Sequence, residues 1–179
     1  MKVSILGASG YVGGELLRLL LDHPNVSVEQ VTSERLAGKR VTTAHPNLRG
    51  RTELYFSRLA DLTPCDLLFA ALPHESFVGK FAEVQSIAPR IIDMSADFRL
   101  RSVDAYETWY GHRHTDPTTL GKFVYGLPEL HRSTIRNASY VTGKGCLATA
   151  AILGLLPPLR EGVVSEREAI IQAKGGSSA

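Results

Sequence analysis

The stretch Val3-Ser4-Ile5-Leu6-Gly7-Ala8-Ser9-Gly10-Tyr11-Val12-Gly13-Gly14 decides the fold of this chain. Val3 to Leu6 predicts a short strand, and Leu16, Leu19 and Leu20 recur at helical spacing after the glycines. A strand, a glycine turn and a helix in this order are typical of a dinucleotide-binding fold, where the helix amino terminus faces the pyrophosphate. The G-x-x-G-x-x-G spacing is weak by itself, and its position directly after an amino-terminal strand strengthens it. The alternative is a glycine-rich turn without a ligand.

The glycine turn and the end of the second strand supply the expected cofactor contacts. The second strand, Val26 to Thr32, runs into Ser33-Glu34-Arg35. An NAD-binding domain commonly carries an acidic residue here, roughly 20 residues after the glycines, to hold the ribose hydroxyls. The Ser33 hydroxyl and the Arg35 guanidinium suit the 2′-phosphate of NADP, and Glu34 is the counter-argument. We therefore expect NADP(H) to be bound by Gly7, Ser9, Gly10, Tyr11, Val12, Gly13, Ser33 and Arg35.

Two later strands also end in polar residues. Asp66 to Leu72 is a continuous apolar run, as expected of a central parallel strand, and Pro73 and His74 follow it. Arg90 to Met94 predicts another strand, which leads into Ser95-Ala96-Asp97-Phe98-Arg99. Because α/β sheets bind ligands at the carboxyl ends of strands, the expected cofactor site also includes Leu72, Pro73, His74 and Ser95.

Each of these polar groups has a structural alternative. His74 suits a cofactor contact and equally suits capping the helix expected over residues 77–88. Ser95 with Arg99 suits a phosphate, and equally suits a helix cap beside a surface arginine. His112 and His114 invite a metal site, but no third ligand is nearby, so we expect a solvated loop and no metal.

Cys146 is the candidate nucleophile. The segment Gly143-Lys144-Gly145-Cys146 places it at the first position of an alanine- and leucine-rich run that predicts a helix ending at Pro157 and Pro158. Unpaired backbone amides and the helix dipole favour a thiolate at that position. The alternative is a small buried residue at a helix start. The other cysteine, Cys65, is expected to be structural.

These elements predict an α/β, Rossmann-type fold: a mostly parallel sheet with helices on both faces. We expect an NADP-binding domain over residues 1–150, which includes the nucleophile. Residues 151–179 are expected to supply a connecting helix and the first strand, Ala169 to Ala173, of a second α+β catalytic and dimerisation domain. Since no helix follows that strand, we expect this second domain to be truncated.

The composition limits the partners. The 179 residues are 44% hydrophobic and 21% charged, with a formal net charge of +2, which favours a globular protein without a nucleic-acid or membrane partner. The leucines from Leu16 to Leu21 are interrupted by Arg18 and are too few to span a membrane. Two cysteines are too few for a disulfide framework, so we expect a cytoplasmic protein.

Two other functions share some of these features. Tyr140 and Lys144 fit the Y-x-x-x-K pair of short-chain dehydrogenases, which requires both residues on one helix face. Glycines flank Lys144, and Ser139 to Thr142 predicts a strand, which argues against that pair. A non-catalytic module that binds or senses NADP is the second alternative.

The motifs together resemble the N-acetyl-gamma-glutamyl-phosphate reductase family, within the aspartate-semialdehyde dehydrogenase superfamily. The resemblance covers essentially the whole chain and rests, in the family's order, on Gly7–Gly13, Leu72–His74, Ser95–Arg99, Tyr125–Glu129 and Gly145–Cys146. It implies NADP-dependent reduction of an N-blocked gamma-glutamyl phosphate to its semialdehyde through a thioester on Cys146. It also implies a homo-oligomer, a dimer or tetramer, and an acid/base histidine in a region beyond residue 179. We expect Arg99 and Ser95 to assist phosphate binding.

One departure bears on the substrate. The arginine-biosynthesis enzymes usually carry Asn-Pro-Gly-Cys-Tyr-Pro-Thr around the nucleophile, whereas this chain has Gly143-Lys144-Gly145-Cys146-Leu147-Ala148-Thr149. This is nearer the lysine-biosynthesis branch, which reduces an aminoadipyl phosphate bound to a carrier protein. His45-Pro46-Asn47-Leu48-Arg49-Gly50-Arg51-Thr52 is similar to the same branch. A small-molecule and a carrier-bound acyl phosphate both remain open as substrates.

Overall fold

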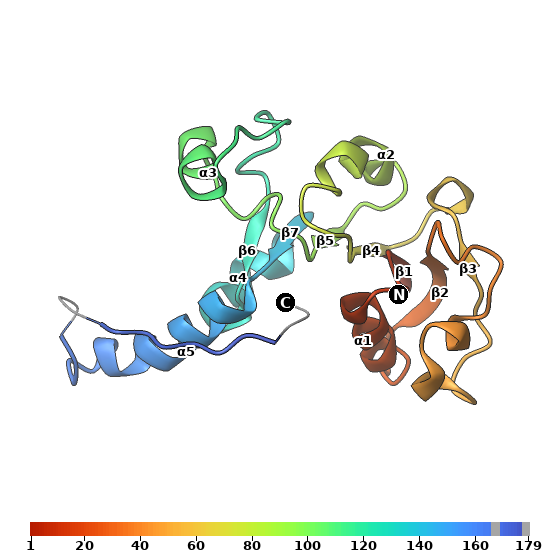
Figure 1. The fold of residues 1–179 in the computed structure, drawn as a ribbon, viewed down its shortest axis with the longest axis horizontal. Coiled ribbons are helices and arrows are strands. Elements are labelled where there is room, and N and C mark those ends of the chain that lie inside the picture. Colours follow the sequence, from red (N-terminus) through yellow and green to blue (C-terminus); the bar gives the residue numbers. More distant parts are fainter. Residues whose placement is uncertain (166–168, 177–179) are drawn as a thin grey trace. The chain divides into compact units, whose positions relative to one another are not determined.

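The structure, a computed structural model, describes residues 1–165 and 169–176 (Figure 1). The chain divides into two compact units, Met1–Gly143 and Lys144–Ala179. The domain boundary expected at residue 150 lies inside a helix, and the division between the units falls near the start of that helix.

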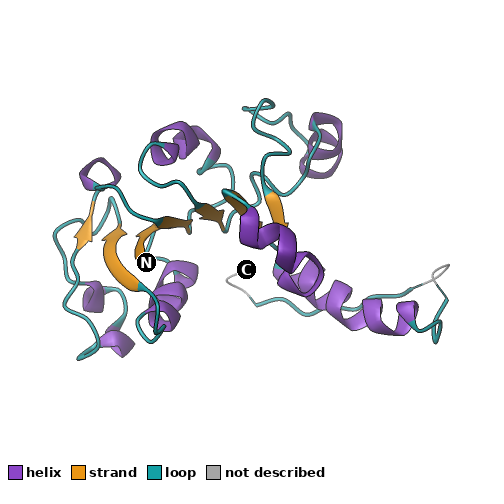
Figure 2. Cartoon of the chain, turned by 180° about the vertical axis from the view of Figure 1, so that it is seen from behind, coloured by secondary structure: helices purple, strands orange, loops and turns teal. Residues whose placement is uncertain are grey.

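The first unit is built on one parallel sheet. Its strands lie in the order β3-β2-β1-β4-β5-β7-β6, and every neighbouring pair is parallel, which confirms the predicted Rossmann-type sheet. Figure 2 shows the strands from behind. Their bounds are β1 Lys2–Leu6, β2 Ser27–Thr32, β3 Phe56–Ser57, β4 Leu67–Ala70, β5 Ile91–Asp93, β6 Val124–Gly126 and β7 Tyr140–Gly143.

The strand order reverses direction between β1 and β4. From β1 the chain builds outward to β2 and β3, then returns to place β4 on the other side of β1. Val3 and Ile5 of β1 pair with Leu67 and Phe69 of β4. In doubly wound sheets ligands bind at the carboxyl ends of the strands beside such a reversal. The topology therefore predicts a ligand site at the loops that follow β1 and β4.

Helices cover both faces of the sheet. Alternate residues of β4 point to opposite faces: Leu68 packs in one buried cluster, together with Phe81 and Val84 of α2, and Phe69 packs against the other, which contains Leu17 of α1. Figure 1 shows α1 and α2 on opposite sides of the strands. The helices of this unit are α1 Tyr11–Leu20, α2 Phe81–Gln85, α3 Val103–Tyr110 and α4 Pro128–Asn137.

One helix prediction needs correction in the first unit, and one helix was not predicted. The helix expected over residues 77–88 is divided into a 3-10 turn, η4 Val78–Lys80, and the short α2. The turn forms because the Asp97 carboxylate accepts hydrogen bonds from the backbone amides of Phe77 and Val78. Helix α4 was not predicted; it begins at Pro128, a favourable residue for a first helical position, and has no fully buried residue.

The second unit contains α5, Cys146–Arg160. The prediction that Pro157 and Pro158 end this helix was wrong. Their carbonyls accept hydrogen bonds from the amides of Glu161 (3.1 Å) and Val163 (2.9 Å), so the prolines contribute to a final turn through their oxygen atoms.

The strand expected over residues 169–173 was also wrong. Residues 169–176 have no regular secondary structure. Ile170 and Ile171 are exposed, and no strand of the described residues pairs with this segment. A β pattern in the sequence forms a strand only when a partner edge is available for its hydrogen bonds.

Candidate functional site

The glycine turn after β1 packs closely against its surroundings. Gly7 has a positive φ of 79°, and a Cβ added to it would lie 2.6 Å from the carbonyl oxygen of Ala71, just beyond β4. A Cβ on Gly13 would lie 2.6 Å from the Cα of Ala8. Only glycine fits at either position. The turn after β1 and the segment after β4 are therefore in direct contact.

Gly10 is different, because a Cβ built there meets only the carbonyl oxygen of Gly7, at 3.8 Å. The open space lies where α1 begins, with Gly10 as its N-cap. The first-turn amides of Tyr11, Val12 and Gly13 have no carbonyl partner within the helix. Their partial positive charge and the open space at Gly10 fit a pyrophosphate. Tyr11 and Val12 are exposed beside this space.

Hydrogen bonds join the glycine turn to the end of β2. The Gly7 amide donates to the Thr32 hydroxyl (3.1 Å) and the Ala8 amide to the Thr32 carbonyl (2.8 Å). The hydroxyls of Ser9 and Ser33 lie 2.8 Å apart. Two residues predicted from separate motifs to bind the cofactor are thus in contact.

The acidic residue after β2 has a structural partner. Glu34 Oε1 accepts a hydrogen bond of 2.9 Å from the Leu59 amide, at the start of the 3-10 turn η3 Leu59–Asp61. Arg35 is exposed, and no ion pair within the described residues uses it. The structure thus engages Glu34 with a backbone amide and leaves the Arg35 guanidinium without an ion pair among the described residues.

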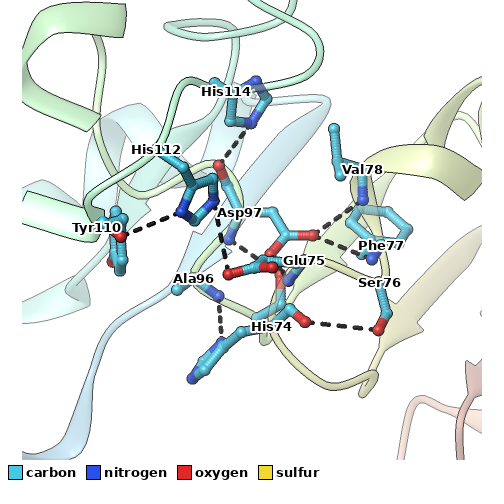
Figure 3. A network of polar contacts seen from close by, with 11 residues as sticks. His74, Glu75, Ser76, Phe77, Val78, Ala96, Asp97, Tyr110, His112 and His114 are labelled. Carbon is cyan, nitrogen blue, oxygen red and sulfur yellow. Dashed lines mark hydrogen bonds and ion pairs between the residues drawn. The ribbon is translucent and has the colours of Figure 1, made fainter. Parts of the chain in front are cut away.

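Asp97 organises the turn that follows β4 (Figure 3). Its carboxylate accepts hydrogen bonds from the amides of Glu75 (2.6 Å), Phe77 (3.0 Å) and Val78 (2.9 Å). His74 Nδ1 accepts from the Ala96 amide at 2.8 Å, and the His74 ring is exposed. The capping role weighed for His74 therefore belongs to Asp97, and the exposed ring lies at the carboxyl edge beside Leu72 and Pro73.

His114 corrects one expectation. It is buried, not solvated: its Nε2 donates to the Asp97 carbonyl (2.9 Å) and its Nδ1 accepts from the Asp116 amide (3.0 Å). His112 is exposed and lies 3.5 Å from a Glu75 carboxylate oxygen. Among residues 1–165 and 169–176, no group of three or more His, Cys, Asp or Glu side chains could hold a metal ion.

Ser95 is fully buried in the turn after β5. Its hydroxyl donates to Asp93 Oδ2 (2.8 Å) and accepts from the Asp97 amide (3.1 Å). Its expected contact with cofactor or phosphate stays a prediction, and the structure shows that the hydroxyl also holds this turn together. Burial raises the pKa of the Asp93 carboxyl to about 7, although the Ser95 amide and hydroxyl both donate to it.

Asp93 should therefore make stability depend on pH. The folded protein keeps a proton that the unfolded chain releases near pH 4, so this group's contribution is fully present below that pH and is lost as the pH rises through 7. Asp93→Asn, which cannot ionise, should gain up to about 4 kcal/mol relative to wild type between pH 4 and pH 8. Urea unfolding of both proteins across this range measures the difference. Parallel stability curves would contradict the assignment.

Arg99 connects the ends of two strands. Its Nε donates a hydrogen bond of 2.8 Å to the carbonyl of Gly143, which is the last residue of β7. Its Nη2 donates a hydrogen bond of 3.3 Å to the carbonyl of Met94, just after β5. No ion pair within the described residues uses this guanidinium. Gly143 itself has little room, since an added Cβ would lie 3.1 Å from the Asp93 carbonyl oxygen. A positive charge is thus fixed at the carboxyl edge of the sheet.

Cys146 is the first residue of α5 and is exposed, with Gly145 as the N-cap. This contradicts the alternative of a buried residue at a helix start, and Cys65, expected to be structural, is buried. The Thr149 amide and hydroxyl both donate to the Gly145 carbonyl, at 2.9 and 2.8 Å. The peptide before the cysteine is therefore anchored to the first turn.

Tyr140 and Lys144 do not form a short-chain dehydrogenase pair. Tyr140 begins strand β7, and its ring packs 5.1 Å from the Phe81 ring and 5.4 Å from the Phe123 ring. Lys144 follows the strand, so the two residues do not share a helix face. The phenol ring belongs to the aromatic core of the first unit.

Sequence reasoning missed three residues of this edge. Thr32 holds the glycine turn, Asp97 holds the turn after β4, and His45 Nε2 lies 2.8 Å from the Ala8 carbonyl oxygen. Thr32 ends the predicted second strand and Asp97 lies in the Ser95–Arg99 motif, but the sequence does not indicate which backbone groups their side chains bind. His45 is far from the turn in sequence, and only its histidine-proline motif marked it.

The fold and these loops define a dinucleotide-binding domain. A sequence profile described as the NAD-binding domain of semialdehyde dehydrogenase matches residues 2–138, and the chain belongs to that family. No helix of the described residues is long and apolar enough to cross a membrane.

Named relatives cover the chain almost completely. It is 53% identical to a putative LysW-L-2-aminoadipate 6-phosphate reductase of Thermomicrobium roseum, over 99% of this chain and 51% of the relative. It is 48% identical to LysW-L-2-aminoadipate 6-phosphate reductase of Deinococcus radiodurans, with the same coverage. An N-acetyl-gamma-glutamyl-phosphate reductase of Marinobacter nauticus is 44% identical over 99% of this chain and 52% of its own length. The chain thus spans about half the length of these relatives.

Solved structures share the fold. Aspartate semialdehyde dehydrogenase II of Vibrio cholerae superposes with a TM-score of 0.60 at 18% identity, over 89% of this chain and 46% of that one. Aspartate semialdehyde dehydrogenase of Candida albicans, solved with NADP, has a TM-score of 0.51 at 16% identity, over 90% and 47%. At these identities the likeness concerns the fold alone.

Proposed function

We propose that the protein carrying this chain is an NADP-dependent reductase that converts an N-blocked acyl phosphate of amino-acid biosynthesis into its semialdehyde. The observation that carries the proposal is that the Ser9–Ser33 contact, after β1 and β2, and the Arg99–Gly143 contact, after β5 and β7, both lie at the carboxyl ends of strands of one parallel sheet. Cys146 follows Gly143 by three residues in the sequence and is the exposed first residue of α5. The reductase names of the relatives support the reaction class.

NADP(H) is the proposed cofactor. Gly7, Gly10 and Gly13 shape the turn, whose Ser9 lies beside Ser33. Ser33 and Arg35 are proposed to hold the 2′-phosphate, because Glu34 is engaged by Leu59. Leu72, Pro73 and His74, after β4, are proposed to lie along the nicotinamide half, and Ser95 to act from its buried position by holding the neighbouring turn.

The proposed mechanism is covalent. The Cys146 thiolate attacks the acyl carbon, the C–O bond to phosphate breaks, and inorganic phosphate leaves with the electron pair, giving a thioester. NADPH, when bound, would supply the hydride that reduces this thioester to a thiohemiacetal on Cys146. Collapse of the thiohemiacetal releases the aldehyde and regenerates the thiolate. Cys146 is the first residue of α5, whose first-turn amides have no carbonyl partner within the helix.

Arg99 is proposed to bind the departing phosphate, because its guanidinium is fixed by two carbonyls and has no carboxylate partner within the described residues. Arg99→Ala should raise the KM for inorganic phosphate in the aldehyde-oxidising direction by about tenfold or more. The assay uses the full-length enzyme, with NADPH binding measured alongside to show that the edge is intact. Unchanged kinetics would exclude the assignment.

The proposed substrate is a carrier-bound aminoadipyl or glutamyl phosphate, with acetylglutamyl phosphate as the small-molecule alternative. Relatives named for LysW-linked substrates support the carrier, and the Gly145-Cys146-Leu147-Ala148-Thr149 sequence agrees with them. We further propose a cytoplasmic homo-oligomer, a dimer or tetramer, whose acid/base histidine lies outside residues 1–179.

The deciding assay gives the full-length protein each acyl phosphate in turn, with NADPH or NADH. The proposal expects semialdehyde formation with NADPH preferred, and turnover of one of the two acyl phosphates. A protein that binds NADPH but reduces neither acyl phosphate would instead support the alternative of a non-catalytic NADP-binding module.

A further inference from the structure

We propose that His45 is a positioning residue for the cofactor: it fixes the peptide of the glycine turn that faces the pyrophosphate. The inference rests on the proposed binding of NADP(H). It concerns a histidine that stands 37 residues from its partner in the sequence and that the mechanism above does not use.

The contact is a single hydrogen bond with a defined direction. His45 Nε2 lies 2.8 Å from the carbonyl oxygen of Ala8, in the middle of the turn between Gly7 and Gly10. A carbonyl oxygen only accepts hydrogen bonds, so Nε2 carries the proton in this arrangement. The imidazole thus holds the Ala8 oxygen in place.

Helix α1 makes room for the imidazole at Gly14. A Cβ built on Gly14 would lie 2.3 Å from His45 Cε1 and 2.5 Å from its Nδ1. The His45 ring therefore occupies the space that a side chain at position 14 would need, and only glycine fits beside it. Gly13 serves the turn itself, and Gly14 serves the histidine that supports the turn.

His45 is itself held by the segment that carries it. Its amide donates to the Val41 carbonyl (3.0 Å), and its own carbonyl accepts from the Leu48 amide (3.0 Å). Val41 and Leu48 are fully buried, and the ring meets the Phe56 ring edge-on at 6.4 Å. The segment between β2 and β3 thus holds the imidazole in place through its own hydrogen bonds and buried residues.

The bond to Ala8 sets the direction of the next amide. In a planar trans peptide the carbonyl of Ala8 and the N–H of Ser9 point in opposite directions. The Ala8 amide is already fixed by Thr32, and the Ser9 amide has no hydrogen bond within the described residues. Holding the Ala8 oxygen at His45 Nε2 therefore directs the Ser9 N–H to the opposite side of this peptide, where we infer that it is available to a phosphate oxygen.

The test compares two ligands on the full-length protein. NADPH contains the pyrophosphate, whereas adenosine 2′-monophosphate carries only the adenosine and the 2′-phosphate. Dissociation constants are measured by calorimetry, together with Tm, for His45→Leu, which removes the donor, and His45→Gln, which keeps a donor at similar reach. His131→Leu, an exposed histidine on α4, is the matched control.

His45→Leu is expected to raise the Kd for NADPH about tenfold, leaving the Kd for adenosine 2′-monophosphate unchanged. His45→Gln should restore NADPH binding to within about threefold, and His131→Leu should match wild type. Gly14→Ala, whose methyl group displaces the ring, should reproduce His45→Leu, and the double variant should be no weaker than either.

Three results would each overturn the inference: an equal rise in Kd for both ligands, an unchanged Kd for NADPH in His45→Leu, or a Kd for NADPH in His45→Gln as high as in His45→Leu. If His45→Leu does not fold, the comparison of Gly14→Ala with wild type decides by the same criteria. A wild-type protein that fails to bind NADPH would instead contradict the proposed function, so the two failures are distinct.

Discussion

Replacement of Cys146 by serine is expected to lower acyl-phosphate reduction by about 10⁴-fold or more, because a hydroxyl at this position is a far weaker nucleophile than a thiolate. The residue is exposed at the first position of α5, so the substitution removes no core packing. The full-length Cys146→Ser protein should keep its Tm and its Kd for NADPH. Steady-state kinetics and calorimetry measure the two effects separately.

Cys65→Ser provides the comparison, since Cys65 is buried and is assigned no chemical role. It should keep its catalytic rate once folded. Alkylation by iodoacetamide does not separate the two cysteines by reactivity, because exposure alone favours Cys146. A better reference for alkylation is an exposed thiol introduced by Ser133→Cys, in the middle of α4, in the Cys146→Ser background. Its alkylation rate is compared with that of Cys146 in the wild-type protein. A Cys146→Ser enzyme that retains a tenth of its activity would contradict the nucleophile assignment.

Gly10→Ala is expected to raise the Kd for NADPH by about 10- to 100-fold with little change in Tm. A methyl group at Gly10 meets only one protein atom, at 3.8 Å, so it fits the folded chain but occupies the space proposed for the pyrophosphate. Fluorescence titration and thermal unfolding of the same preparation measure both quantities.

Gly7→Ala is the contrasting variant. Its positive φ and a Cβ placed 2.6 Å from the Ala71 oxygen should destabilise the fold itself, by about 2 kcal/mol or more. Gly79→Ala, with open space around its added Cβ, controls for a generic glycine effect. Unimpaired NADPH binding by a folded Gly10→Ala protein would exclude the proposed cradle.

The parallel sheet could be predicted because its strands are apolar runs bounded by glycine, proline and polar residues. The apolar runs Val3–Leu6 and Asp66–Leu72 predict β1 and β4 in this way. The boundaries near residue 77 could not be predicted, since they depend on the Asp97 carboxylate binding amides about 20 positions earlier in the chain. Long-range polar contacts leave no periodic signal.

The site shows the same division. The glycine turn and Cys146 are predicted from local patterns, because the proposed chemistry requires those residue types at strand and helix ends, and the structure places them at the end of β1 and the start of α5. His114 and His45 were not understood from the sequence, since their burial and partners arise from segments distant in the chain. The strand prediction at Ile170 and Ile171 was wrong for the opposite reason. The local β pattern is present, but no strand within the described residues pairs with this segment.

The central claim, a thioester on Cys146, is tested most directly by mass spectrometry of the full-length protein mixed with the acyl phosphate in the absence of NADPH. The account predicts an acyl adduct on the peptide that contains Cys146, which disappears with release of the semialdehyde when NADPH is added. Turnover without any adduct on this peptide, or an adduct on another residue that NADPH discharges, would contradict it.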